Sequence, residues 1–310
     1  MIHTIVHVAL VLLFPPLLLG VINKTKAFFA GRKGPPLLQL YFDLLKLFRK
    51  GVVLSRSTSW VFVAGPVVTL AAAFAASLLV PLGDHTSPVA FTGDLILFAY
   101  LFGLARFFTS AAALDTGSAF EGMGAAREVG FACLAEPALF FGFLATAKIS
   151  GSLSLSRMLA EPWSFGLNGS SASLILVVMS FLIVLLAETS RVPFDDPNTH
   201  LELTMIHEVM VLDHSGPLLG VVLYGASIKL FVLGALVMRL LLPAGLSAGA
   251  SNPLLAGSIE WIVFALAMIG LAIGVGVIES IMARLRLNRV PQLLVTACLL
   301  SAFGMLLLLR

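Results

Sequence analysis

The sequence predicts an all-α, polytopic integral membrane protein. Of its 310 residues, 59% are hydrophobic and only 11% are charged, and the mean hydropathy is +1.04, whereas soluble domains contain roughly 45–50% apolar residues. Apolar runs of about 20 residues recur along the chain, and each can cross a hydrocarbon layer of about 30 Å as a helix. The runs are continuous rather than alternating, which excludes a membrane β-barrel. We expect one membrane domain over residues 1–310.

Eight apolar runs are expected to be transmembrane helices. Their approximate bounds are 3–23, 60–81, 90–109, 129–149, 172–190, 217–242, 258–281 and 290–309. Pro15 and Pro16 remove two adjacent backbone donors from the first run, so this span should be kinked. The run lacks a basic leader and a small-residue cleavage site, so we interpret it as a span and not as a signal peptide.

The basic residues in the connections predict the orientation of the spans. The loops at about 24–59, 110–128, 191–216 and 282–289 share one side and carry 13 Lys and Arg residues, while the opposite loops hold only Arg157. We therefore expect these four loops to face the cytoplasm, with both termini on the outer side of the cell inner membrane. We interpret the net charge of +3 as a result of these basic loops, which set the orientation in the membrane. Because we find no soluble basic surface with base-stacking aromatics, nucleic-acid binding is excluded.

An amphipathic helix at the membrane interface is predicted within the first of these loops. From Leu37 to Lys50 the residues are apolar nearly throughout, and Gln39, Asp43 and Lys46 recur at steps of four and three, with Lys50 four further on. This spacing places one polar stripe on an otherwise apolar helix. Two interpretations remain open, a simple membrane-surface helix and a docking platform for a soluble subunit.

Ionisable residues inside the expected spans are the strongest functional candidates. Each costs roughly 2.5–3.5 kcal/mol on insertion scales, so such groups usually face a cavity or a partner. The candidates are Glu136 in the fourth span, Glu188 at the end of the fifth, Lys229 in the middle of the sixth and Glu279 at the end of the seventh. Two structural alternatives exist, in which Glu279 pairs with Arg284 on the same helix and Glu188 caps a helix end at the headgroup level.

The segment from residue 188 to residue 216 is acidic on a side otherwise marked by positive charge. It holds six of the 16 acidic residues of the chain and a single arginine. The acidic residues are Glu188, Asp195, Asp196, Glu202, Glu208 and Asp213, and the arginine is Arg191. Clustered carboxylates repel one another, which raises their proton affinity and couples their titrations. We therefore predict a proton entrance here.

Histidines of the same segment are not spaced as metal ligands. His200, His207 and His214 recur every seven residues, which is a rise of about 10.5 Å along a helix. The pair His207 and Glu208 resembles the start of a zincin motif, but Val211 stands where the second histidine is required. A metalloprotease is therefore excluded, and hydrogen bonding or proton relay is the predicted role of these histidines.

One part of this segment resembles a known family. Residues 188–217 read ETSRVPFDDPNTHLELTMIHEVMVLDHSGP, which resembles the signature loop of the membrane subunit shared by respiratory complex I and group 4 nickel-iron hydrogenases. Residues 31–47 (GRKGPPLLQLYFDLLKL) and 120–129 (FEGMGAAREV) support the resemblance. The stretch THLELTMIHE, residues 199–208, is similar to the hydrogenase branch, of the formate hydrogenlyase subunit 4 and hydrogenase-4 component C type. Departures from that branch are Asp196, Asp213 and His214, where Asn, Glu and Tyr are common.

The resemblance implies roles for individual residues. Glu136, Glu188 and Glu202 would line an acidic path between a peripheral redox arm and the membrane pumps, and Arg191, Pro193 and Asp195 would shape the loop beneath the catalytic subunit. The charge argument adds Glu208, Lys229 and Glu279 to this proton path, and Asp196, His200, His207 and Asp213 are grouped with the peripheral-arm loop.

We therefore predict a non-catalytic membrane anchor and ion-coupling subunit of a group 4 hydrogenase complex. The resemblance implies hydrogenase large and small subunits and antiporter-like membrane subunits as partners, with the nickel-iron and iron–sulfur centres in those partners. Cys133 and Cys298 each lie alone in an apolar run, so no cofactor is expected in this chain. The alternatives are a quinone-site subunit of a complex I-type NADH:quinone oxidoreductase and a free-standing transporter, for which we find no internal repeat.

Overall fold

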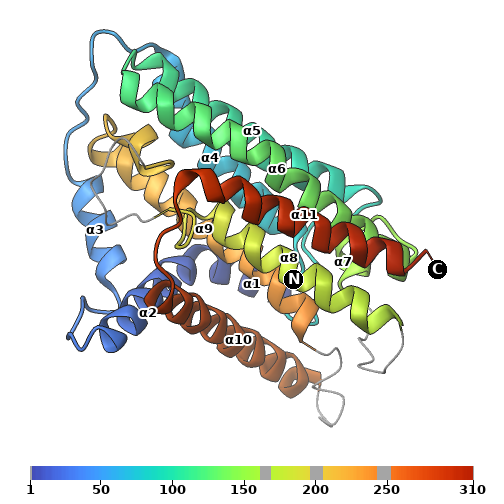
Figure 1. The fold of residues 1–310 in the computed structure, drawn as a ribbon. Coiled ribbons are helices and arrows are strands. Elements are labelled where there is room, and N and C mark those ends of the chain that lie inside the picture. The colour runs from blue at the N-terminus through green and yellow to red at the C-terminus, as the bar shows by residue number, and fades with distance from the viewer. Residues whose placement is uncertain (1, 161–168, 196–204, 243–252, 310) are drawn as a thin grey trace.

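The computed structural model describes residues 2–160, 169–195, 205–242 and 253–309, and it is helical throughout its regular parts (Figure 1). In chain order the helices are α1 (Ile2–Leu13), α2 (Pro15–Phe29), α3 (Gln39–Phe48), α4 (Trp60–Leu79), α5 (Asp94–Asp115), α6 (Ala119–Ser150), α7 (Leu155–Met158), α8 (Gly169–Glu188), η1 (Glu208–Val211), α9 (Gly216–Leu241), α10 (Pro253–Ile281), η2 (Leu287–Arg289) and α11 (Val290–Leu307). The predicted all-α class is confirmed.

Seven of the described helices are long and apolar enough to cross a membrane, namely α4, α5, α6, α8, α9, α10 and α11. The pair α1 and α2 passes the same test together and is bent by 46° at its break, which makes eight candidate spans in the described residues. The bend lies next to Pro15 and Pro16, so the predicted kink is confirmed. The chain is a multi-pass membrane protein.

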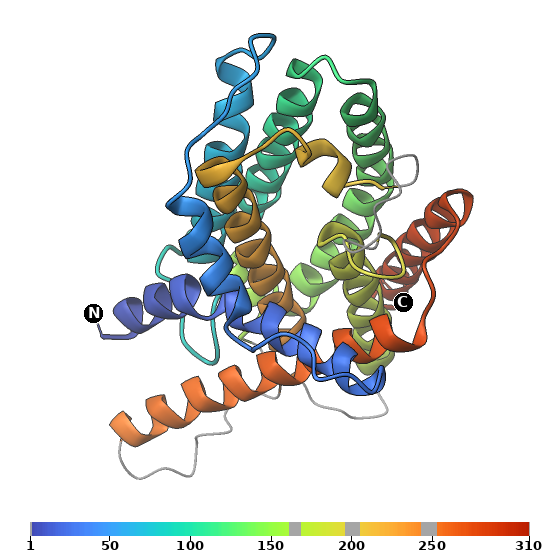
Figure 2. The same ribbon diagram turned by 90° about the vertical axis from the view of Figure 1, so that its left-hand side faces the viewer.

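Helix α9 lies at the centre of the bundle. Of its apolar stretch 61% is buried, against 28% for α10 and α11, and it packs against α2, α3, α4, α8 and α10. Helix α4 packs along α5, whereas α11 packs along α6 and α8. Helix α10 is held mainly by α2 and projects from the rest of the bundle (Figure 2).

The helices α5 and α6 continue through most of the segment that was expected to be a loop at about 110–128. Only residues 116–118 separate them, because alanines favour the helix and the polar groups find partners. Glu121 is 1% exposed, and its Oε1 accepts a hydrogen bond from the backbone N–H of Asp213 at 3.0 Å. An added Cβ at Gly124 would lie 2.4 Å from Val209 Cγ1, so the absence of a side chain lets η1 seat on α6.

Helix α3 forms where the amphipathic helix is predicted. Its Gln39 donates from Nε2 to Asp43 Oδ1 at 2.9 Å, which joins the first two members of the polar stripe. Lys50 lies beyond the end of the helix. Leu44 is buried against the bundle, while Phe42 remains 55% exposed. An apolar outer face of this kind is typical of a helix that lies at a membrane interface or beneath a partner.

Candidate functional site

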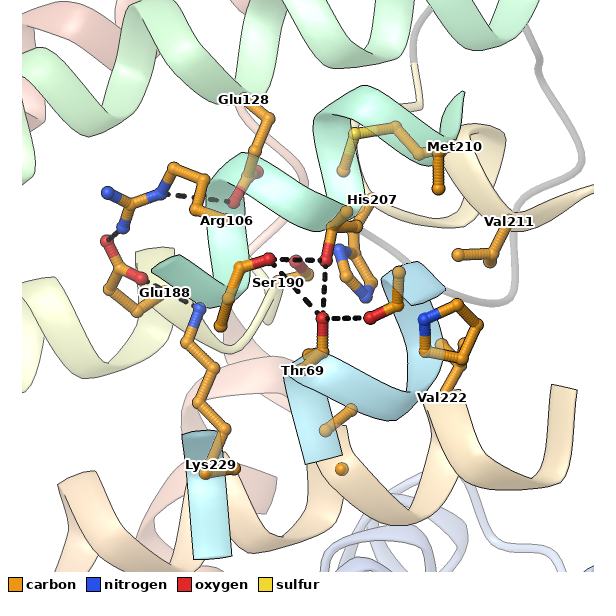
Figure 3. Close-up of a pocket in the computed structure, with 18 of the residues that line it drawn as sticks. Thr69, Arg106, Glu128, Glu188, Ser190, His207, Met210, Val211, Val222 and Lys229 are labelled. Atoms are coloured by element: carbon orange, nitrogen blue, oxygen red, sulfur yellow. Dashed lines mark hydrogen bonds and ion pairs between the residues drawn. The ribbon is translucent and has the colours of Figure 1, made fainter. Parts of the chain in front are cut away.

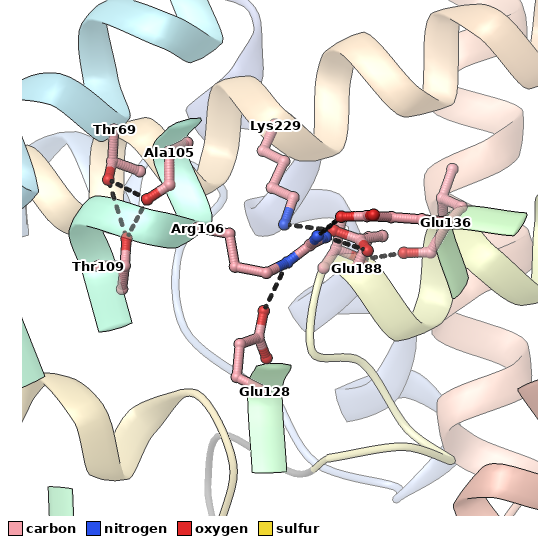
Figure 4. Close-up of polar contacts among 10 residues, drawn as sticks. Thr69, Ala105, Arg106, Thr109, Glu128, Glu136, Glu188 and Lys229 are labelled. Carbon is pink, nitrogen blue, oxygen red and sulfur yellow. Dashed lines mark hydrogen bonds and ion pairs between the residues drawn. The ribbon is translucent and has the colours of Figure 1, made fainter. Parts of the chain in front are cut away.

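Five ionisable side chains from four spans meet near one end of the bundle, and we call them the charge cluster. Arg106 of α5 lies at its centre, where one nitrogen is ion-paired with Glu136 of α6 and Nη2 lies 2.6 Å from Glu188 Oε1 of α8 (Figure 4). Its Nε lies 3.9 Å from Glu128 Oε1. Lys229 of α9 places Nζ 2.8 Å from the second oxygen of Glu188. The cluster therefore joins α5, α6, α8 and α9.

Close helix packing brings these groups together. An added Cβ at Gly142 would lie 2.2 Å from the ring of Phe181, so a glycine there lets α6 approach α8. An added Cβ at Gly65 would lie 2.6 Å from the Cβ of Ala112, which lets α4 approach α5 in the same way. Small residues thus let α6 approach α8 and α4 approach α5 closely.

The charge cluster is unbalanced when all of its groups are ionised. Three carboxylates face two cations, which leaves one negative charge without a counter-charge. The side chains of Arg106 and Glu188 are 10% and 6% exposed, whereas that of Glu136 is 46% exposed. An uncompensated charge in a poorly hydrated site is costly. Among the three carboxylates, that of Glu136 is the most accessible.

A cavity of about 70 Å³ lies beside the charge cluster (Figure 3). A water molecule needs about 10–15 Å³ of such space and several polar partners, so the cavity has room for a few waters. Its polar lining is Thr69, Arg106, Thr109, Glu128, Glu188, Thr189, Ser190, His207, His214 and Lys229. Thr69 Oγ1 and Thr109 Oγ1 lie 2.9 Å apart. These two hydroxyls are therefore within hydrogen-bond distance of each other.

A second cavity of about 300 Å³ lies on another side of the same cluster. Its walls include the apolar side chains of Phe98 and Phe143. Arg106 and Glu188 line both cavities, and Glu136 lines only the second. The charge cluster therefore lies between the first cavity, next to the 205–215 segment, and the second. We call the first one the polar cavity because hydroxyl, imidazole and charged side chains line it.

The residues of the acidic segment are tied to their surroundings through Asp195. Its Oδ2 accepts hydrogen bonds from the backbone N–H groups of Ile206 at 3.0 Å and His207 at 3.1 Å. Its Oδ1 lies 3.0 Å from Arg284 Nη2. Asp195 is 1% exposed, so this buried carboxylate joins the backbone of residues 206 and 207 to the α10–α11 connection.

Glu279 belongs to a different group of charges. Its Oε2 lies 2.8 Å from Lys26 Nζ and its Oε1 lies 3.4 Å from Arg191 Nη1, with the side chain fully buried. The alternative pairing with Arg284 is wrong, because Arg284 pairs with Asp195. The alternative in which Glu188 caps a helix end at the headgroup level is also wrong, since its carboxylate lies between two cations.

The other predicted site residues are placed as follows. Glu208 begins η1, Asp213 is exposed, and the carbonyl of Pro193 accepts a hydrogen bond from the N–H of Leu285 at 2.9 Å. Asp196, His200 and Glu202 lie outside the described residues. The structure thus brings Glu136, Glu188 and Lys229 together and places Glu279 apart from them.

Sequence reasoning missed the central residue of the cluster. Arg106 lies within the predicted third span, so the rule that singled out Lys229 applies equally to it. Glu128 was treated as a loop residue, although it lies in α6. No group of three or more His, Cys, Asp or Glu side chains among the described residues is placed to hold a metal ion. That this chain carries no cofactor of its own stays a prediction.

His214 lines the polar cavity and stacks on α4. Its ring lies 4.1 Å from that of Phe62 at an interplanar angle of 25°, and the residue is 5% exposed. Burial lowers the pKa of His214 from 6.5, and the backbone of Phe62 and the carboxylate of Asp213 oppose this shift more weakly. The ring is therefore neutral at neutral pH.

Acidification is expected to loosen the segment from residue 205 to residue 215. Because the folded pKa of His214 lies below 6.5, the unfolded segment binds a proton more readily than the folded one. The neutral ring therefore stabilises the folded segment above pH 6.5. This stabilisation is lost as the pH falls from 6.5 toward the folded pKa. Hydrogen exchange, corrected for its intrinsic pH dependence, measures this. In His214→Phe, which keeps the ring stacking, the pH dependence should be smaller, and equal dependence in both proteins would contradict the prediction.

The chain has relatives among the membrane proteins of redox complexes. The sequence profile of the NADH dehydrogenase family matches residues 2–310. The chain belongs to this family. Among its relatives, formate hydrogenlyase subunit 4 of Escherichia coli (strain K12) is 32% identical over 281 residues, which cover 90% of this chain and 89% of the relative. Hydrogenase-4 component C of the same organism is 32% identical over 79% of this chain and 76% of its own length.

More distant family members come from NADH-quinone oxidoreductase. One such oxidoreductase subunit, from Syntrophotalea carbinolica, is 27% identical over 82% of this chain and 76% of its own length. A chain of the membrane-bound sulfane sulfur reductase, an archaeal respiratory membrane complex, shares the fold with a TM-score of 0.81 at 21% identity, over 99% of this chain and 98% of that one. The resemblance predicted from the 188–217 segment is therefore confirmed at the level of the family.

Proposed function

We propose that the chain is the membrane anchor and ion-coupling subunit of a membrane-bound group 4 hydrogenase complex of the formate hydrogenlyase type. The observation that carries this proposal is the charge cluster, in which Arg106 joins three carboxylates from two helices between two cavities. Hydrogenase large and small subunits would hold the nickel-iron and iron–sulfur centres, and antiporter-like subunits would lie beside the chain in the membrane. The chain itself would perform no redox chemistry.

The basic loops support an orientation for this arrangement. The segments at about 24–59, 110–128, 191–216 and 282–289 would face the cytoplasm of a cell inner membrane, and both termini would lie on the outer side. A redox partner would then bind over the acidic segment, next to the polar cavity lined by His207 and Glu128. The higher identity to hydrogenase-type relatives supports this branch over a quinone-site subunit of complex I.

The chemistry would be proton exchange driven by charge. Arg106 carries five N–H donors and stays protonated, so it can redistribute its bonds among the carboxylates without itself losing a proton. A change of charge in the bound redox partner would alter which carboxylate of the charge cluster is ionised. The proton would then pass between the waters and hydroxyls of the polar cavity and Glu136, which lines the second cavity.

Glu136→Gln is expected to reduce proton transport while the complex still assembles. The side chain is 46% exposed, so loss of its charge should be tolerated, but an amide cannot take up the proton. We expect hydrogen-linked proton transport in membrane vesicles to fall by about an order of magnitude or more. The matched control is Glu260→Gln, whose carboxylate lies 3.3 Å from His85 Nε2, away from the charge cluster. Full transport in both Glu136→Gln and Glu202→Gln would contradict the proposal.

A further inference from the structure

The break between α1 and α2 leaves backbone carbonyl groups without their helical donors. In an α-helix the N–H of residue i+4 bonds to the carbonyl of residue i. Pro15 and Pro16 have no N–H, so the carbonyls of Val11 and Leu12 lose their donors. The N–H of Leu17 bonds at 3.1 Å to the carbonyl of Phe14 instead of that of Leu13. Three adjacent carbonyls thus lack their helical donors at the break.

Two tyrosine hydroxyls replace the missing donors of two of these carbonyls. Tyr224 of α9 donates to the carbonyl of Leu12 at 2.8 Å, and Tyr41 of α3 donates to the carbonyl of Leu13. The chain contains only three tyrosines, so two of them are placed at one break. An unpaired carbonyl in a membrane costs several kcal/mol, which makes both hydroxyls part of what holds the bend.

The helix that supplies Tyr41 is clamped between two spans. An added Cβ at Gly20 of α2 would lie 1.9 Å from the carbonyl oxygen of Leu37, just before α3. An added Cβ at Gly216, the first residue of α9, would lie 2.4 Å from the carbonyl oxygen of Gly51, just after α3. Backbone contact at both ends means that α3 cannot shift without moving α2 or the start of α9.

Helix α9 connects the same break to the charge cluster. Tyr224 and Lys229 lie on one helix, five residues or about 7.5 Å of rise apart. A change in the angle between α1 and α2 would therefore pull on the helix that positions Lys229 Nζ against Glu188. Helix α3, the break between α1 and α2, and the charge cluster are thus linked through direct contacts.

We propose that Tyr41 and Tyr224 are positioning residues that close a hinge in the first span and couple its angle to the surface helix α3 and to α9. Displacement of α3, whose outer face carries exposed Phe42 and Leu45, releases the Leu13 carbonyl and lets the first span straighten or swing. The hinge does not depend on proton transport, because it consists only of the bend and its two hydroxyl bonds.

Spin labels across the break measure the hinge directly. Labels would be attached at Ile5→Cys and Phe29→Cys, which replace exposed residues of α1 and α2, in a full-length chain with Cys133→Ala and Cys298→Ala, kept in native lipid. We expect one narrow distance distribution in the parent. Tyr41→Phe and Tyr224→Phe should each raise the ratio of open to closed conformers by about fivefold to tenfold, and the double variant by more. Thr296→Val, which removes a hydroxyl bonded within α11 to Gln292, should change nothing.

A second pair of variants separates the hydroxyl bond from a general loss of packing. Pro16→Ala restores an N–H for the Leu12 carbonyl, so Tyr224→Phe should have little effect on the distance distribution in that background. An unchanged narrow distribution in the double tyrosine variant would overturn the proposal. So would an equal effect of Tyr224→Phe with and without Pro16, since the effect would then not arise from the Leu12 carbonyl.

Discussion

Replacing Arg106 by alanine is expected to prevent stable insertion and assembly of the chain. The substitution leaves the carboxylates of Glu136, Glu188 and Glu128 facing one another with only Lys229 to balance them. Removing one partner of a buried ion pair costs about 3–5 kcal/mol, which is a large share of the roughly 5–15 kcal/mol that stabilises a typical domain. The amount of chain in isolated membranes and the melting temperature of the purified complex measure the loss.

Two further arginine variants separate charge from geometry. Arg106→Lys keeps the positive charge but replaces the planar fork by a compact ammonium, so it should restore part of the stability while failing to contact all three carboxylates. Arg127→Ala is the matched control, because Arg127 lies near the same end of the bundle and donates from Nη1 to the backbone carbonyl of Met205 at 2.9 Å. Wild-type levels and melting of Arg106→Ala would show that the charge cluster does not hold α5, α6 and α8 together.

The spans were predictable because each depends on a local property of the chain. A run of about 20 apolar residues predicts a membrane helix whatever surrounds it, and adjacent prolines predict a break, as at Pro15 and Pro16. The extent of α5 and α6 was underestimated because it depends on contacts made by other segments. The buried Glu121 accepts a hydrogen bond from the backbone of Asp213, and hydropathy alone does not report such a contact.

The candidate site was predictable as a set of residues but not as a set of pairs. Intramembrane charge singled out Glu136, Glu188 and Lys229, and the structure joins these three. Arg106 reaches partners that lie 30 and 82 positions away along the chain, and such pairing depends on how the helices are arranged around α9. For the same reason Glu279 was grouped with the proton path, although Lys26 of α2 places it in a separate group.

A charge-balanced pair of variants is expected to separate the structural role of the charge cluster from its role in transport. Glu188→Gln alone removes the carboxylate that lies 2.8 Å from Lys229 Nζ, and leaves that ammonium poorly paired at depth in the bundle. Such a change should destabilise the complex by several kcal/mol. The double variant Glu188→Gln with Lys229→Met removes one charge of each sign, so the net charge of the cluster is unchanged and most of the lost stability should return.

Transport is expected to behave differently from stability in the double variant. Without Glu188 and Lys229, Arg106 and Glu136 no longer connect through charged groups to α9, and the wall shared by the two cavities loses a charged side chain. We therefore expect the double variant to assemble and melt nearly as the wild type does while hydrogen-linked proton transport in vesicles stays low. Recovery of both stability and transport would mean that the pair only fastens α8 to α9. Recovery of neither would mean that the two effects cannot be separated at this position, and that Glu188 is required for the fold itself.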